Sequence, residues 1–177
     1  TDSLKGYQVI KVLGDDSIKV ASGMESIIKI PLSYSTSTND DSLDGLKILV
    51  HYNTQQLEFL GFSEILDRSF KGTEVLPEIN DIYRGGYWFY SHQVSIRWSS
   101  VSENWPMMPL PTKLLTARFK LNNTLVDGEE AWVEFSSDEP ATGYALKAIQ
   151  FKVNVEKVEG LSALSLGGDN NDTYSVK

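Results

Sequence analysis

Apolar and polar residues alternate along most of the chain. Residues 25–34, for example, place Ile28, Ile30 and Leu32 on one face. One apolar and one polar face per segment predict antiparallel strands that are solvated on one side. Segments with this pattern are 17–21, 25–34, 45–52, 57–62, 93–100, 114–121, 130–135 and 149–155. About eight or nine such strands, separated by Gly, Asn, Asp and Pro turns, predict an all-β, antiparallel β-sandwich of jelly-roll type with very little helix.

The apolar faces of these segments would meet between two sheets. A turn after Tyr52 would start with Asn53 bonding its own backbone in an Asx-turn. Only residues 62–70 space their apolar side chains as a helix does, and a 3₁₀ turn or an irregular strand fits them equally well. We expect a sandwich domain over residues 1–158 and a C-terminal tail over residues 159–177. The expected core residues are Ile30, Leu32, Leu46, Ile48, Val50, Tyr52, Leu57, Phe59, Ile96, Trp98, Phe119, Val133, Phe135, Phe151 and Val153.

Length and charge narrow the classes of function. With 177 residues, 41% of them apolar, the chain can bury one good core. A formal net charge of −8 and the lack of a basic stripe in the sequence argue against nucleic-acid binding. No apolar run approaches the ~20 residues of a membrane span. Cysteine is absent, which excludes disulfides and thiol chemistry, and we expect a monomer.

The residues that could support catalysis form no recognisable motif. His51 and His92 lie in or near predicted strands without a serine nucleophile motif, so we place both on a sheet surface rather than in a catalytic triad. Asp40, Asp41 and Asp44 could hold Ca²⁺ through carboxylate oxygens, but they lack the glycine of an EF-hand and fit a solvated loop. We therefore expect no enzymatic activity.

Aromatic residues supply the candidate binding positions. Residues 83–90 contain five aromatic side chains around a glycine pair, and a strand there would point Tyr87 away from Trp88 and Tyr90. One set would enter the core, and the other would cover a sheet edge or contact a sugar or a protein. Trp105 lies in the proline-rich loop 100–112, which would cap one end of the sandwich or form a contact surface. The candidate binding residues are Tyr87, Trp88, Tyr90 and Trp105.

Four segments, read in order, resemble the cohesin family. Its opening pair of strands is similar to SIKVASGMESIIKIPLSYS, and its most telling segment to LDGLKILVHYNTQQLEFLGF, where Asn53 and Thr54 replace the usual Asp-Pro. VSIRWSS is similar to its central strand, and KLLTARFKLNNTLVDGEEAWVEF to a later strand pair. The resemblance covers roughly residues 17–156 and implies a non-catalytic sandwich that binds a protein partner such as a dockerin.

The end of the chain resembles a second family. Residues 167–175, GGDNNDTYS, match the nonapeptide Gly-Gly-x-Gly-x-Asp-x-apolar-x of RTX calcium-binding proteins, with Asn170 replacing a glycine. The resemblance implies Ca²⁺ as a cofactor, Asp169 and Asp172 as candidate ligands, and a longer parent protein secreted by a bacterial type I system. One repeat supplies few of the about 6–8 oxygens that Ca²⁺ takes, so we expect weak binding. The alternative is a Gly/Asn/Asp-rich disordered end.

These features together predict a non-catalytic binding module of a larger, secreted, RTX-containing bacterial protein. It would recognise a dockerin-like protein partner or serve in adhesion. Two alternatives stay open at this point: a carbohydrate-binding module that uses exposed aromatics on a polysaccharide, and a structural spacer.

Overall fold

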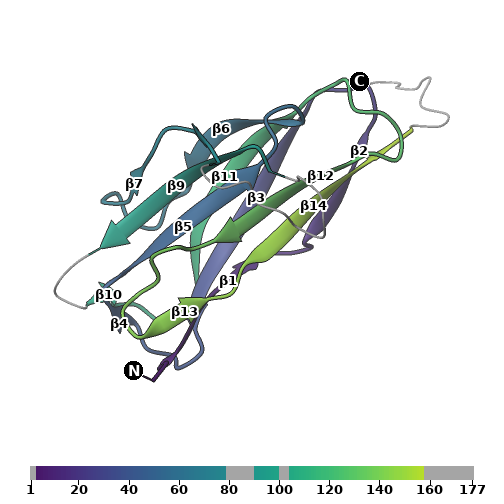
Figure 1. Ribbon diagram of the computed structural model, residues 1–177. Coiled ribbons are helices and arrows are strands. Elements are labelled where there is room, and N and C mark those ends of the chain that lie inside the picture. Colours follow the sequence, from purple (N-terminus) through teal and green to yellow (C-terminus); the bar gives the residue numbers. More distant parts are fainter. Residues whose placement is uncertain (1–2, 79–89, 100–103, 158–177) are drawn as a thin grey trace.

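The computed structural model describes residues 3–78, 90–99 and 104–157, and every regular element in them is a β-strand (Figure 1). The predicted all-β sandwich is confirmed, and no helix occurs in these described ranges. The strands are β1 (Gly6–Val12), β2 (Ser17–Ala21), β3 (Ser26–Thr36), β4 (Ser42–Leu43), β5 (Gly45–Tyr52), β6 (Leu57–Ser63), β7 (Lys71–Gly72), β8 (Leu76–Pro77), β9 (His92–Ser99), β10 (Trp105–Pro106), β11 (Thr112–Leu121), β12 (Glu130–Ser136), β13 (Tyr144–Leu146) and β14 (Ile149–Glu156).

Two sheets form the layers of the sandwich. One has the order β13-β1-β3-β11-β6, and the other has the order β2-β14-β12-β5-β9-β7, with β8 also pairing with β9. In Figure 1 the strands β9, β5, β12 and β14 lie in front of β11 and β3. Strands β4 and β10 form a separate pair at one end.

The pairing is antiparallel with two exceptions that the alternation pattern does not reveal. Strand β1 pairs in parallel with β13, and β2 pairs in parallel with β14. The cause is that the N-terminal segment crosses from one sheet to the other between β1 and β2. Each half then lies beside a strand from the C-terminal part of the chain. The expectation of purely antiparallel sheets is corrected at these two edges.

The core lies between the sheets, where the apolar faces of the strands meet. All the predicted core residues are buried except Phe59 and Trp98, which are partly buried and pack against the core. The register of β6 and β11 shifts beside Phe59, and Gly61 takes a φ of 125° there. Trp98 lies near the end of β9, where its indole N–H donates to Ser69 Oγ.

Two local turns show how short-range chemistry sets the chain path. Asn53 forms the expected Asx-turn, because its Oδ1 accepts the Gln55 N–H at 2.9 Å. Residues 62–70 form no helix: β6 ends at Ser63, and Asp67 Oδ1 then accepts the Ser69 N–H at 2.8 Å in a second turn. The apolar spacing of this segment instead brings Phe70 onto Trp105, with ring centroids 5.7 Å apart.

Candidate functional site

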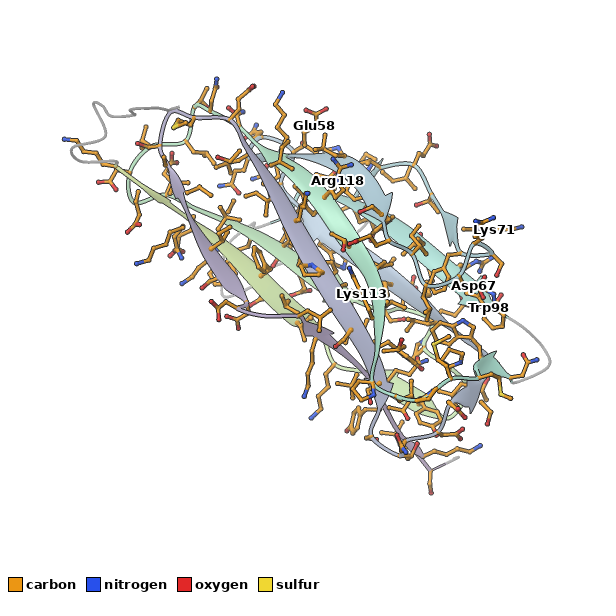
Figure 2. All side chains as sticks on the ribbon, turned by 180° about the vertical axis from the view of Figure 1, so that it is seen from behind. Glu58, Asp67, Lys71, Trp98, Lys113 and Arg118 are labelled. Carbon is orange, nitrogen blue, oxygen red and sulfur yellow. The ribbon has the colours of Figure 1, made fainter. Side chains whose placement is uncertain are left out.

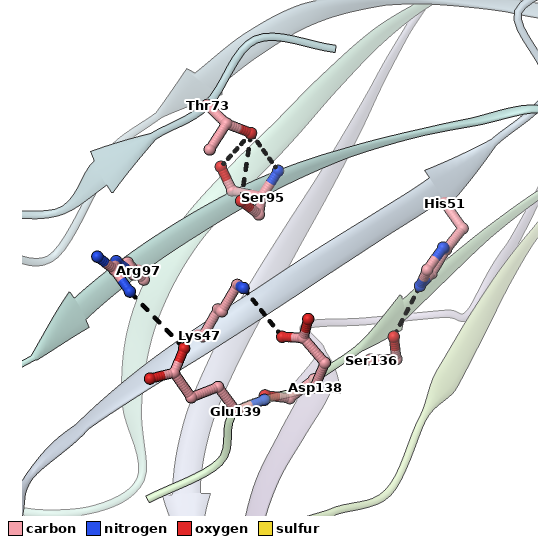
Figure 3. Close-up of polar contacts among 9 residues, drawn as sticks. Lys47, His51, Thr73, Ser95, Arg97, Ser136, Asp138 and Glu139 are labelled. Atoms are coloured by element: carbon pink, nitrogen blue, oxygen red, sulfur yellow. Dashed lines mark hydrogen bonds and ion pairs between the residues drawn. The ribbon is translucent and has the colours of Figure 1, made fainter. Parts of the chain in front are cut away.

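The outer face of β9, β5 and β12 carries a set of polar contacts between neighbouring strands and loops (Figure 3). Successive residues of a strand point to opposite sides, so Lys47, Leu49 and His51 point outward while their neighbours enter the core. The register sets Lys47 beside Arg97, Leu49 beside Ser95 and Ser136, and His51 beside Glu134. Three strands thus present rows of mixed polar side chains.

Two ion pairs border this face. Lys47 and Arg97 are direct cross-strand neighbours, and like charges in that position repel each other. The repulsion is offset because Lys47 Nζ lies 3.0 Å from Asp138 Oδ1 and Arg97 Nη1 lies 3.6 Å from Glu139 Oε1. The side chains of Arg97, Asp138 and Glu139 are more than half exposed, so each pair adds about 1 kcal/mol or less to stability. Their effect is mainly to order charges on the surface.

The segment that supplies Asp138 and Glu139 is anchored from below by Gln8. Its Oε1 accepts the Ala141 N–H at 2.9 Å, and its Nε2 donates to Gly45 O at 2.7 Å and to Tyr34 OH at 2.9 Å. Gln8 and Tyr34 are fully buried, and this burial raises the pKa of the Tyr34 hydroxyl. Gln8 therefore fixes the position of the acidic rim, which is formed by Asp138 and Glu139. A rim that is already fixed loses less conformational entropy when a partner binds.

The opposite border is held by the corner between β7 and β8. Thr73 N–H donates to Ser95 O at 2.8 Å, and Ser95 N–H donates to Thr73 Oγ1 at 3.0 Å. Their hydroxyl oxygens lie 3.2 Å apart. A small cleft of about 70 Å³ opens at the end of the face, lined among others by Lys47, Arg97 and Trp98. The face is therefore held by hydrogen bonds at both borders and hollowed at one end.

His51 lies in a buried hydrogen-bond chain that sequence reasoning missed. Its Nδ1 is 2.6 Å from Glu78 Oε1, and its Nε2 is 2.7 Å from Ser136 Oγ. The expected exposure of His51 on a sheet surface is wrong, since Glu78 and the Tyr90 ring cover it and leave it 3% exposed. The cause is that residues from three separate segments meet only in the fold.

Glu78, His51 and Ser136, joined by these hydrogen bonds, are the residue types of a hydrolytic triad. A triad also needs donors for an oxyanion and a cleft in which the serine meets a substrate. The imidazole is covered, with His51 only 3% exposed. The arrangement instead ties Glu78 and β12 to β5. His92, at the start of β9, is half-buried with its Nδ1 2.8 Å from Ser91 Oγ.

The outer face of the other sheet is basic. Lys11, Lys29, Lys113, Arg118 and Lys120 lie on three adjacent strands, and Figure 2 shows Lys113 and Arg118 along β11 on this side. Two ion pairs offset part of the charge, Lys113 with Glu64 at 2.7 Å and Lys120 with Glu25 at 3.2 Å. The hydrogen bond from Lys113 holds the pKa of the Glu64 carboxyl below its usual range. The sequence hid this stripe because its members alternate with apolar residues in separate segments.

The aromatic candidates divide into buried residues and residues outside the described ranges. Tyr90 and Trp105 are 3% and 2% exposed, which agrees with the alternatives of core packing for Tyr90 and end-capping for Trp105. Trp105 stacks on Trp98 at 5.6 Å and contacts Tyr34 at 4.9 Å between ring centroids, which caps one end of the sandwich. Tyr87 and Trp88 lie outside the described residues, and their binding role stays a prediction.

The candidate Ca²⁺ ligands of the loop 40–44 also have structural partners. Asp40 Oδ1 accepts the Ser42 N–H at 2.9 Å and its hydroxyl at 2.8 Å, which lowers the pKa of Asp40. Asp44 Oδ1 accepts the Thr142 N–H at 3.0 Å. No group of three or more potential metal ligands occurs in the part of the chain that the structure describes. Asp169 and Asp172 lie outside that part, and Ca²⁺ binding by them stays a prediction.

Comparison with known proteins finds likeness in structure but not in sequence. No family model and no curated protein matches the chain. The seventh ScaB type I cohesin of Pseudobacteroides cellulosolvens matches with a TM-score of 0.54 and 12% identity, over 90% of this chain and 99% of that one. The fold is cohesin-like. This agrees with the resemblance to cohesins that the sequence shows.

Two further cohesin structures were solved with dockerins bound. The sixth cohesin of Acetivibrio cellulolyticus scaffoldin B, in complex with a variant Cel5 dockerin, has a TM-score of 0.53 and 13% identity, over 85% of this chain and 99% of that one. A type I cohesin–dockerin complex of Clostridium thermocellum gives a TM-score of 0.50 and 10% identity, over 84% of this chain and 99% of that one.

Among the described residues, no helix is long and apolar enough to cross a membrane.

Proposed function

We propose that this chain is a non-catalytic recognition module that binds a dockerin-like protein through the outer face of β9, β5 and β12. The observation that carries the proposal is the pre-set rim of alternating charges formed by Lys47, Arg97, Asp138 and Glu139. The cohesin-like fold supports it, because two of the similar cohesins named above were solved in complex with dockerins. The proposal assigns binding to this face and no catalytic step.

The chemistry of the face suits a polar protein surface. Fixed charges of both signs penalise misaligned partners and speed the encounter with aligned ones. Lys47 and Arg97 are cross-strand neighbours, so a partner carboxylate placed between them would be attracted by both, in competition with Asp138 and Glu139. The small cleft beside Trp98 could take one protruding side chain. A partner with carboxylates around a protruding side chain fits these features.

The opposite sheet offers a matched control. Its basic face presents Arg118 and Lys29 as cross-strand neighbours, as the proposed face presents Arg97 and Lys47. Arg118→Glu therefore makes the same charge change at the same kind of position on the other side of the sandwich. If binding depended only on net charge, both reversals would weaken it alike.

The experiment measures calorimetric affinity for a panel of dockerin modules, including the Cel5 and Clostridium thermocellum dockerins of the similar structures. We expect one member to bind, Arg97→Glu to weaken its affinity at least about tenfold, and Arg118→Glu to leave it within about twofold. No binding across the panel would refute a dockerin partner. A larger loss from Arg118→Glu would place the interface on the other sheet.

The wider setting belongs to the same proposal. We infer a monomeric module that acts outside the cell, in recognition or adhesion, within a longer RTX-containing protein exported by a type I system. The repeat-like residues 167–175 support this setting, and they would add Ca²⁺ ligands to following repeats. A parent protein without further repeats would remove the RTX setting and leave the recognition function standing.

A further inference from the structure

The basic face on the outer side of β1, β3 and β11 carries more positive charge than the carboxylates beside it balance. Its five cations on these strands are Lys11, Lys29, Lys113, Arg118 and Lys120. A sixth, Lys147, follows β13, and its Nζ lies 4.8 Å from the centroid of the outward Tyr7 ring. Among the described residues, three carboxylates pair with these cations or face them, namely Glu25, Glu58 and Glu64. The face is therefore locally positive on a chain whose formal net charge is −8.

Lys29 and Arg118 form the centre of the basic face, and Figure 2 shows Arg118 on this side of β11. They are direct cross-strand neighbours, and like charges in that position repel each other. None of the ion pairs between described residues includes either of them, whereas Lys113 and Lys120 each have one carboxylate partner. The pKa of the Glu64 carboxyl is lowered first by its hydrogen bond from Lys113, and the charge of Lys29 contributes less. An anion over the centre would therefore relieve a repulsion.

Short polar side chains separate the cations. Ser33 lies between Lys11 and Lys113 across three strands, and Thr116 has Ser63 as its neighbour on β6. The central rows, residues 29–33 of β3 and 113–118 of β11, contain no aromatic residue. Protein interfaces are usually anchored by a cluster of large aromatic or apolar side chains in a pocket. The basic face offers spaced charges and hydroxyl groups instead.

The spacing of these charges selects the class of polyanion. Neighbouring strands lie about 4.8 Å apart, and successive outward residues of one strand are about 7 Å apart. Duplex DNA carries about one negative charge per 1.7 Å, so most of its phosphates would meet no cation on this face. A polyuronate carries one carboxylate on each sugar ring and hydroxyl groups between the carboxylates. Its lower charge density and its hydroxyl groups match the face.

We propose that the basic face binds a linear anionic polysaccharide of the polyuronate class, with Lys29 and Arg118 on its carboxylates and Lys113 and Lys120 beside them. The inference does not depend on the dockerin-like partner, because Lys47 and Arg97 belong to the other sheet of the sandwich. Both ligands would be bound at once. The module would then attach a protein partner to an acidic polysaccharide.

The test measures calorimetric affinity of the full chain for hexagalacturonic acid and for its fully methyl-esterified form. The ester is a matched probe, because it keeps the sugar chain and removes the charges. We expect the acid to bind and the ester not to bind. Raising the salt concentration from about 50 mM to about 200 mM should weaken binding of the acid at least about fivefold, because bound counterions are released.

The variants locate the site. Arg118→Glu should weaken binding of the acid at least about tenfold, because the new carboxylate also pairs with Lys29. Lys29→Glu makes the equivalent change at an exposed position and serves if Arg118→Glu does not fold. Glu58→Gln removes the carboxylate opposite Lys120 and should strengthen binding about twofold. Arg97→Glu changes the net charge equally on the other sheet and should leave binding within about twofold.

The same variants distinguish this proposal from the dockerin proposal. Loss of uronate binding in Arg118→Glu with unchanged dockerin binding supports a separate polysaccharide site. The inference fails if the acid does not bind, if the ester binds as tightly, or if Arg97→Glu weakens binding as much as Arg118→Glu. Tighter binding of a hexaglutamate peptide or of single-stranded DNA than of the acid would also overturn it, and would assign an acidic protein or a nucleic acid to this face.

Discussion

Gln8 is the residue whose replacement tests most directly how the core supports the recognition face. Gln8→Met keeps the length and apolar volume of the side chain and removes its three hydrogen bonds. The groups left behind are the Gly45 carbonyl, the Ala141 N–H and the Tyr34 hydroxyl. All belong to buried residues, so water cannot replace the lost partner.

The expected loss of stability follows from this count. A buried polar group left unpaired costs about 1–3 kcal/mol, so three such groups with partial relaxation cost about 3–6 kcal/mol. Tyr34→Phe alone should cost about 1 kcal/mol, because one bond is lost. In the double variant Gln8→Met/Tyr34→Phe, no Tyr34 hydroxyl is left unpaired. The loss of stability in the double variant should therefore be about 1 kcal/mol smaller than the sum of the losses in the two single variants.

Urea unfolding at neutral pH measures these differences as shifts of the midpoint at constant slope. Gln55→Met, an exposed position, is the control and should stay within about 0.5 kcal/mol of the native chain. Hydrogen exchange of the Ala141 amide should accelerate in Gln8→Met before global unfolding, since the anchor of the acidic rim is lost. A loss below about 1 kcal/mol together with unchanged Ala141 protection would refute the anchoring role.

Three other perturbations give separate checks. Phe119→Ala should destabilise the fully buried core by about 3–5 kcal/mol, and an unchanged melting temperature would contradict its place there. His51→Ala should cost about 3 kcal/mol in urea unfolding, because it leaves the buried Glu78 carboxylate unpaired; a neutral result would mean that water replaces the imidazole. The lowered pKa of carboxyl groups such as Asp40 stabilises the folded state at pH values above the unfolded pKa, which is near 4. The urea concentration at the unfolding midpoint should therefore decrease as the pH is lowered from about 5 to about 2, and a midpoint that does not change with pH would contradict this. Calorimetry should find Ca²⁺ binding weaker than micromolar in this chain, and micromolar binding abolished by Asp172→Ala would overturn that expectation.

Alternation along the chain was enough to predict the fold class and most of the core. A strand has a side-chain period of two, so Ile30, Val50 and Phe119 could be assigned to the inner face before any contact was known. The Asx-turn at Asn53 was predictable for a similar reason, since it involves only neighbouring backbone groups. Such features depend on short-range rules, and the sequence determines them wherever the pattern is regular.

The tertiary structure alone decided which outward residues meet. Alternation identified the side of each strand but not its neighbours, so it could not join His51 to Glu78 and Ser136 or align five cations on β1, β3 and β11. It also hid the strand switch, which places Asp16 beside Lys152 across more than a hundred residues. The number of aromatic residues in a segment did not predict which of them are exposed. Tyr90 and Trp105 are buried, because burial of their rings lowers the free energy of the folded state. Binding surfaces come from strand order and register, and these are set by contacts between distant segments that no local pattern records.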